Sequence, residues 1–413
     1  MYEYLNFKKY DMIDGNFTIN SSPKVLIWDN FQLKNIGGPM GYCYNIHEFL
    51  KKHPNNQIAF LSDYFKNKTQ VTTTNKKTSK IRAFLSNIKA LYNYLFIKNR
   101  CKLSIPENLN LNEFDYIHFH WSTDILATEK LLVNFKGKKI LTSHCPCPLT
   151  DELVSNNPIW WKWFRYFLLK RESSAFNKVD YIMFPCFEAR EPYEKNSLLK
   201  KCFEKNAAKF FYVPSAIMDC SFDEEKIQKF RDLGIPDNAF VITYFGRHNE
   251  IKGYDILKEV GMKLLKKYDN LYFLCAGVGP VLPLKHPRWI ELGFINNTQE
   301  LLSQSDLYIL PNRETYFDLV VLEILRSSTN LLLSNTGGNK YFQLLDKNDT
   351  NGIVFFDIDN FDDIVSLVQK FIEEKNIDKV AYQEKGKCNR KLFEKMFTMD
   401  KFIERYIYAI NNL

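Results

Sequence analysis

The segment at residues 309–340 combines a loop, a helix start and a carboxylate in an order that suits the binding of an anion. It reads as the end of a buried strand, an irregular loop, a helix with Glu323 in its second turn, another apolar strand and a Gly-Gly-Asn turn. A helix N-terminus presents unpaired backbone N–H groups and the positive end of the helix dipole. We therefore expect this loop to bind an anionic ligand such as a diphosphate.

Two histidines in the first half of the chain follow predicted strands. His120 ends the apolar run at 116–120, and His144 comes directly after the run at 139–143. Ligands of open parallel sheets bind beyond the carboxyl ends of the strands, so both histidines are well placed for chemistry. A hydrogen-bonded structural role is favoured for His120 and its neighbour His118, and both roles stay open for His144.

Metal ligands are sparse in this sequence. Cys145 and Cys147 flank a proline beside His144, but no second ligand pair with zinc spacing appears. The nine cysteines are scattered through a long chain, so we expect free thiols. Asp357 and Asp359 form an Asp-x-Asp late in the chain, which is better interpreted as a loop near a helix cap. We expect no metal site.

Length and composition indicate two globular domains. The chain has 413 residues, of which 45% are apolar and 25% charged, and this is long enough for two separate cores. No apolar run approaches the roughly 20 residues of a transmembrane helix, and residues 1–22 lack the apolar core of a signal peptide. We expect a cytoplasmic protein.

Positive charge is concentrated in the first half. Residues 1–215 contain 31 Lys and Arg against 19 Asp and Glu, and the segment 66–102 contains ten basic residues and no acidic one. A second stretch, at 159–171, interleaves three Trp with Lys and Arg at helical spacing. Both stretches would suit an anionic membrane surface, and the first also a phosphate-bearing acceptor, with a solvated face and core packing as the alternatives. Nucleic acid is a less favoured partner, because no nucleic-acid module accompanies the charge.

Strands alternate with helices in both halves. The predicted strands are 24–28, 58–61, 116–120, 139–143, 181–185 and 210–214, then 240–245, 271–275, 289–292, 307–310 and 331–334. The predicted helices are 43–52, 81–98, 159–171, 254–267, 298–303, 361–374 and 399–412. This alternation predicts an α/β fold, and the second half has the pattern of a complete nucleotide-binding domain.

Several motifs occur together in the second half: GRHNEIKGYD (246–255), CAGVGP (275–280), ELGFI (291–295), RETYFDLVVLE (313–323) and SNTGGN (334–339). Weaker ones, IGGPMGYCYNI, IHFH and LTSHCP, lie in the first half. In this order they resemble the retaining glycosyltransferases of family four. The resemblance implies the GT-B fold, two Rossmann-like domains with parallel sheets that face each other across a cleft. The expected divisions are an acceptor-side domain at 1–218, a nucleotide-sugar domain at 219–395 and a helix at 396–413 that crosses back to the first domain.

The resemblance also implies the roles of individual residues. Arg247 and Lys252 match the cations that clamp the diphosphate, whose negative charge rises as the sugar–phosphate bond breaks, and His144 matches the histidine near the donor sugar. Glu323 matches the glutamate that accepts both ribose hydroxyls. The full set of donor-binding residues implied is Gly38, Gly246, Gly277, Phe294, Glu314, Thr315, Phe317, Asp318, Leu319 and Glu323, of which Phe317, Asp318 and Leu319 would offer backbone N–H groups.

One position departs from the family pattern. The family spaces two glutamates eight residues apart, and eight residues before Glu323 the chain has Thr315, with Glu314 one residue early. Either Glu314 reaches the donor sugar through a shifted loop, or Thr315 and the backbone contact the sugar hydroxyls. We favour the second interpretation.

The implied function is transfer of a sugar from a nucleotide-diphosphate donor, with retention and without metal or cofactor, to a glycan or lipid-linked glycan acceptor. The setting would be cell-surface polysaccharide synthesis on the inner face of the membrane, with the protein peripherally associated. A GT-B sugar-nucleotide epimerase and a non-catalytic scaffold remain the alternatives.

Overall fold

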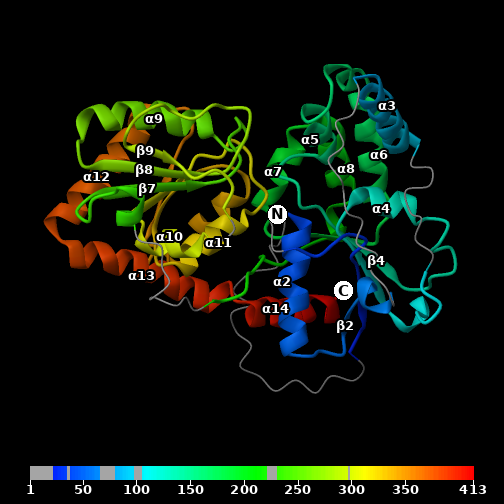
Figure 1. Ribbon diagram of the computed structural model, residues 1–413. Helices are drawn as coiled ribbons and strands as arrows, with labels where there is room; N and C mark the ends of the chain where they lie inside the picture. Colours follow the sequence, from blue (N-terminus) through cyan, green and yellow to red (C-terminus); the bar gives the residue numbers. More distant parts are fainter. Residues whose placement is uncertain (1–21, 35–37, 66–79, 97–104, 221–229, 296–297) are drawn as a thin grey trace.

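The computed structural model describes residues 22–34, 38–65, 80–96, 105–220, 230–295 and 298–413. These residues form two domains, each built on a parallel sheet with helices on both faces (Figure 1). No helix of the described residues is long and apolar enough to cross a membrane. The predicted fold, two Rossmann-like domains with parallel sheets, is confirmed.

The N-terminal sheet has six strands among the described residues, paired in the order β2-β1-β3-β4-β5-β6. They are β1 (Val25–Trp28), β2 (Ile58–Phe60), β3 (Tyr116–Phe119), β4 (Lys138–Thr142), β5 (Tyr181–Phe184) and β6 (Phe210–Tyr212). Every pairing is parallel, so the carboxyl ends of the strands share one edge. The loops after β4 and β5 leave from that edge.

The C-terminal sheet also has six parallel strands among the described residues, in the order β12-β11-β10-β7-β8-β9. They are β7 (Phe240–Phe245), β8 (Leu271–Ala276), β9 (Trp289–Glu291), β10 (Leu307–Leu310), β11 (Asn330–Ser334) and β12 (Ile353–Phe356). Most of these strands are continuous apolar runs because both faces of the sheet are covered.

The helices of the N-terminal domain are α2 (Pro39–Lys52), α3 (Lys80–Phe96), α4 (Ser122–Ala127), α5 (Leu149–Ser155), α6 (Arg165–Asn177), α7 (Glu191–Glu194) and α8 (Ser197–Lys205). Those that follow are α9 (Tyr254–Lys267), α10 (Gln299–Gln304), α11 (Leu319–Arg326), α12 (Phe361–Ile377), α13 (Lys379–Met396) and α14 (Met399–Asn411). Successive side chains of β7 point to opposite faces of the sheet. Ile242 packs with α9 and α12, whereas Val241 belongs to the cluster that includes α10, α11 and α13.

The last helix returns to the N-terminal domain. α14 lies beside α2 in Figure 1, and its Phe402 and Tyr406 share a core with Val25 and Ile27 of β1. The Tyr406 hydroxyl is 2.8 Å from Nδ1 of His118 in β3. This packing joins the end of the chain to the sheet that carries the strand-end histidines.

Three details differ from the sequence predictions. The segment 159–171 is not one helix: a 3₁₀ turn, η3 (Ile159–Phe164), precedes α6, and this buries Trp161 while Trp163 stays outside. The Gly-Gly-Asn turn is the start of a 3₁₀ helix, η8 (Gly337–Leu344), because Gly337 and Gly338 pack directly on the backbone of residues 315–316. Strand β12 and the helices α4, α5, α7, α8 and α13 were not predicted. Of the basic segment 66–102, residues 66–79 and 97–102 lie outside the described residues.

Candidate active site

The candidate site lies where strand ends of the N-terminal sheet meet loops of the C-terminal domain. The ring of Tyr316, in the loop before α11, is 5.0 Å from that of Phe184 at the end of β5 and 6.2 Å from that of His144. Lys195 lies 3.2 Å from Glu314, and Lys340 of η8 pairs with Glu191 of α7. The loop at 313–318 therefore faces the loops that follow β4 and β5.

His144 sits among aromatic rings and a second histidine. Its Nε2 and Nδ1 of His120 share a hydrogen bond of 2.8 Å, and the ring of Tyr42 lies 4.7 Å away. Tyr42 comes from the first turn of α2, which begins after the glycine loop. Because Nε2 of His144 is occupied, Nδ1 is the nitrogen left for a ligand.

Burial keeps the histidines uncharged. It lowers the pKa of His118 and of His144 to about 3, and it lowers the pKa of His120, which also lies beside the other two, well below 6.5. His118 bonds to Thr142 at 2.7 Å and to Tyr406, which is the structural arrangement favoured for it. Nε2 of His120 is buried with no partner among the described residues. Near neutral pH, His144 therefore offers a ligand an uncharged imidazole.

The loop between β7 and α9 is shaped by glycines that leave no room for a side chain. Gly253 has φ +65°, and a Cβ there would lie 1.8 Å from the carbonyl oxygen of Pro311. Gly277 has φ +135°, and its Cβ would lie 1.8 Å from the carbonyl oxygen of Gly246. The predicted glycines Gly246 and Gly277 are thus in direct backbone contact, and the two loops form one unit.

Arg247 and Lys252 occupy different surroundings in that loop. Arg247 is exposed, and its Nη1 lies 3.6 Å from Glu152 of α5, across the domain junction. Lys252 is largely buried, and its Nζ lies 2.8 and 2.7 Å from the two carboxylate oxygens of Asp318. The hydroxyl of Tyr244 donates to the carbonyl of Arg247 at 2.9 Å and holds the loop closed.

The start of α11 brings opposite charges together. Asp318 is the residue that precedes Leu319, the first helical residue, and its side chain binds Lys252 and Asn312 instead of capping the helix. The ring of Phe317 is buried against Phe342, with 5.5 Å between centroids, so only its backbone could serve a ligand. A lysine at a helix N-terminus is unfavourable unless an anion lies beside it.

Glu323 is half-buried one turn further along α11. One of its oxygens accepts a 2.9 Å hydrogen bond from the hydroxyl of Thr298, and burial raises the pKa of the carboxyl group. The bond to Thr298 fixes the side-chain direction and leaves acceptor positions for another ligand. Phe294, three residues beyond Glu291, has an exposed ring. Gly38 precedes α2 with φ +75°, and no described residue lies within 4 Å of where its Cβ would be.

Glu314 is partly exposed, whereas Thr315 is not. Glu314 reaches Lys195 of the other domain, whereas Thr315 is fully buried and its hydroxyl has no partner among the described residues. The carbonyl of Thr315 accepts from Gly338 N at 3.2 Å, beneath η8. A donor could reach the Thr315 hydroxyl only after this loop moved, so the contact favoured from the sequence stays a prediction.

Sequence reasoning missed several residues that contact the predicted site residues, most of them across the domain junction. Tyr42, Glu152, Lys195 and Tyr316 all touch predicted site residues, yet none was predicted. Their contacts join positions far apart in the chain, and no spacing rule signals such pairs. Among the described residues no group of three His, Cys, Asp or Glu side chains could hold a metal ion, and the metal-free mechanism stays a prediction.

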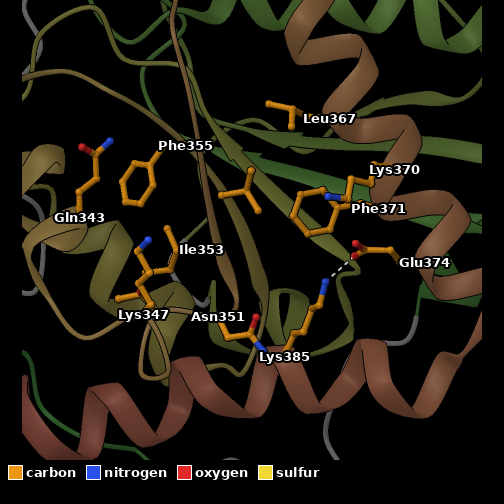
Figure 2. Close-up of a pocket in the computed structure, with 12 residues that line it drawn as sticks. Gln343, Lys347, Asn351, Ile353, Phe355, Leu367, Lys370, Phe371, Glu374 and Lys385 are labelled. Atoms are coloured by element: carbon orange, nitrogen blue, oxygen red, sulfur yellow. Dashed lines mark hydrogen bonds and ion pairs between the residues drawn. The ribbon is translucent and has the colours of Figure 1, made fainter.

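A separate hollow lies on the C-terminal domain, beside strand β12 (Figure 2). It has a volume of about 430 Å³, and Phe355, Phe371 and Lys370 are among the residues around it. The Lys385–Glu374 ion pair, at 2.7 Å, closes one side. None of the predicted site residues lines this hollow.

Comparison with known proteins finds similarity to glycosyltransferases, centred on the second domain. Residues 239–374 match the family model described as "Glycosyl transferases group 1". An uncharacterized glycosyltransferase of Methanocaldococcus jannaschii is 28% identical over 142 residues, 32% of this chain and 35% of that protein. An O-antigen biosynthesis glycosyltransferase of Escherichia coli is 23% identical over 233 residues, 51% of this chain and 60% of that protein. The matches thus cover less than two thirds of these relatives.

Solved structures match over nearly the whole chain. Sucrose-phosphate synthase from Thermosynechococcus elongatus superposes with a TM-score of 0.59 and 12% identity, covering 94% of this chain and 99% of that one. Anabaena HepE, solved with UDP and glucose, gives a TM-score of 0.58 and 13% identity over 95% of this chain and all of its own. At such identity the likeness establishes the fold. Residues 239–374 thus match a glycosyl transferases group 1 model, within a chain that has the two-domain GT-B fold.

Proposed function

We propose that this protein is a retaining, metal-independent glycosyltransferase that uses a nucleotide-diphosphate sugar. The observation that carries the proposal is the pairing of Lys252 with Asp318 at the N-terminus of α11. The ammonium group of Lys252 and the N-terminus of α11 together create a region of positive potential, and the carboxylate of Asp318 is the anion beside them. A diphosphate has the charge and the acceptor oxygens to share this region with Asp318.

The reaction breaks the bond between the anomeric carbon and a diphosphate oxygen, and the electron pair stays on that oxygen. Lys252, Arg247 and the first N–H groups of α11 would stabilise the growing negative charge, which lowers the barrier. The acceptor hydroxyl oxygen bonds to the same carbon from the face that the diphosphate leaves, and its proton passes to the departing phosphate. Retention of configuration follows from attack on that face.

Two residues would orient the donor. Glu323, fixed by Thr298, would accept hydrogen bonds from the ribose hydroxyls. His144, uncharged and bonded to His120 through Nε2, would contact a sugar hydroxyl through Nδ1. Glu314 and Thr315 would determine which donor sugar is accepted, and Glu314 is the more accessible of the two.

The acceptor in this proposal is a glycan or lipid-linked glycan of cell-surface polysaccharide synthesis, and the protein works in the cytoplasm. Support comes from the likeness to a glycosyltransferase named for O-antigen biosynthesis. The chain shares 51% of its length with that relative, so this assignment rests on part of the molecule.

The direct test is a panel of nucleotide sugars. Each is first screened for a rise in Tm, since a ligand at a hundred times its Kd stabilises the folded state by about 2.7 kcal/mol. The donor found is then supplied in radiolabelled form with membrane glycolipid extract, with and without EDTA. Labelled glycan in both reactions is the expected result.

Loss of transfer in EDTA with rescue by manganese would contradict the metal-free mechanism, and release of nucleoside diphosphate without labelled glycan would indicate an epimerase. A protein that binds no donor would be a scaffold.

A further inference from the structure

Helix α3 exposes an apolar stripe to solvent. Residues Ile81, Phe84, Leu85, Ile88, Tyr92 and Phe96, spaced three and four apart along one side, are all exposed, and Ile81 keeps 73% of its surface. A surface helix of a globular domain normally turns its apolar stripe to the core and its polar side to water. The outward stripe of α3 therefore needs a partner.

The orientation of α3 is fixed by its other side. Leu91 is buried in a small cluster with Trp161 and Leu168, and Ala90, Tyr94 and Leu95 pack against the same cluster. The rings of Tyr94 and Trp161 are 6.0 Å apart in an edge-on contact. Because this inner side is packed, the helix cannot rotate to bury the stripe without opening the cluster.

A second exposed apolar group adjoins the stripe. Ile159, Trp163, Tyr166 and Phe167, from η3 and the start of α6, are exposed, and Trp163 keeps 80% of its surface. The rings of Phe84 and Trp160 lie 6.2 Å apart and join the two groups. Figure 1 shows α3 beside α6 on the N-terminal domain, on the side away from the C-terminal domain. We call these ten exposed residues the α3/η3 surface.

The charge around the α3/η3 surface is positive. Neither α3 nor the stretch 159–171 contains an Asp or Glu. Lys89 and Lys162 are exposed and make no ion pair with any described residue, and Nζ of Lys170 lies 4.7 Å from the ring of Tyr166. A partner that carries negative charge fits these cations. A second copy of the chain fits poorly, because a two-fold contact would bring the same lysines face to face.

We propose that the α3/η3 surface docks on an anionic lipid bilayer, with the apolar side chains in the headgroup region and the lysines against lipid phosphates. Exposed Trp and Tyr between cations is the composition that interfacial helices use, since their rings are apolar and their polar ends stay wet. Large exposed apolar patches of this kind mark interaction sites. The inference concerns binding and does not depend on the proposed reaction.

Docking has a consequence that does rest on the proposed function. η3 begins four residues after the end of α5, whose Glu152 contacts Arg247. The docked surface and the candidate site are therefore connected through one short helix of the N-terminal domain. A lipid-linked acceptor would reach the site from this side.

The test is sedimentation with vesicles, without donor or acceptor, so that failure of the reaction does not affect it. The full chain should bind vesicles of phosphatidylcholine with phosphatidylglycerol. Phe84→Ser with Trp163→Ser should lower the partition coefficient about ten-fold or more, because two large apolar anchors are lost. The matched control is Ile377→Ser with Val380→Ser. These two apolar side chains are also largely exposed but lie on α12 and α13, so this variant should bind vesicles like the wild type.

A second double variant tests the contribution of the lysines. Lys89→Gln with Lys162→Gln should weaken binding about five-fold for each lysine at low salt and less at high salt. Lys347→Gln with Lys370→Gln, exposed lysines of the C-terminal domain, is the control. Equal binding by wild type and the Phe84/Trp163 variant would overturn the proposal, as would equal binding to pure phosphatidylcholine. A wild-type dimer that this variant dissociates, with no vesicle binding by either, would assign the surface to a second copy.

Discussion

Both domains have a six-stranded parallel sheet among the described residues, but they hold their ligand loops in different ways. In the C-terminal domain the loops touch backbone to backbone, and a Cβ on Gly253 would lie 1.8 Å from a carbonyl oxygen. In the N-terminal domain Gly38 precedes α2 with a similar φ, +75° against +65°, yet no described residue lies within 4 Å of where its Cβ would be. The C-terminal loops are therefore fixed by backbone contact, whereas Gly38 makes no such contact with the described residues.

Their surfaces differ as well. The candidate-site cations of the C-terminal domain, Arg247 and Lys252, both lie against carboxylates. The exposed lysines of the α3/η3 surface, Lys89 and Lys162, have no such partners among the described residues. Paired cations suit a built site in which an anionic ligand exchanges with a carboxylate, and unpaired ones suit a broad anionic surface.

Substitution of the two glycines gives the largest expected contrast. Gly253→Ala should lower the free energy of unfolding by about 4 kcal/mol or more, because the new methyl group overlaps the Pro311 carbonyl. Gly38→Ala should cost only the backbone strain, about 1–3 kcal/mol. Denaturant unfolding measures both. If both variants lost the same free energy of unfolding, the C-terminal loop would be able to relax around the new methyl group. The difference in packing between the two loops would then not affect stability.

Removal of a clamping cation tests the chemistry of the C-terminal loops. Lys252→Ala should reduce turnover about 10²–10³-fold, because a donor to the developing diphosphate charge is lost. Lys258→Ala, on the following helix, is the control and should leave turnover unchanged. Rates are measured with the donor identified in the panel. A near-normal rate for Lys252→Ala would remove this residue from the site.

Acid should weaken the N-terminal domain through its buried histidines. The pKa values of His118 and His144 lie near 3 in the folded protein against 6.5 for a free histidine. Unfolding therefore takes up protons below pH 6.5, and the free energy of unfolding falls as the pH drops from 6.5 toward 3. Between pH 6 and pH 5 each histidine should account for about 1 kcal/mol.

The variant His118→Gln isolates one of these contributions. Its unfolding free energy should change less with pH than that of the wild type. The difference should equal the contribution of one histidine, about 1 kcal/mol between pH 6 and pH 5. Denaturant titrations at the two pH values give the comparison. An unchanged slope would mean that His118 is solvated or charged in the folded protein.

The smallest effect is expected at the exposed pair across the domain junction. Arg247 and Glu152 lie 3.6 Å apart, and the Arg247 side chain is 70% exposed, so the pair contributes under about 1 kcal/mol to stability. Glu152→Gln should leave Tm nearly unchanged and should tighten donor binding about two-fold, because Arg247 loses a competing carboxylate. Calorimetric titration of the donor measures this. Weaker binding in the variant would mean that Glu152 helps to position Arg247.

Local pattern accounts for what the sequence predicted well. Continuous apolar runs identified β7 and β10 with their observed bounds, and the 3.6-residue period identified α9. The glycine motifs located the loops at 246–253 and 275–280, because positive φ and close backbone contact favour glycine. Strand β12, helix α13 and several short helices of the N-terminal domain were missed.

The sequence by itself thus determined the two α/β halves and the loops from which the C-terminal part of the site is built. Only the tertiary structure decided which side chains meet, such as Glu152 with Arg247 across the domain junction and His120 with His144 within the N-terminal domain. It also decided that α3 buries Leu91 and exposes Phe84. The physical reason is that periodicity reports apolar stripes within one element, whereas burial depends on which neighbours the fold brings against each stripe.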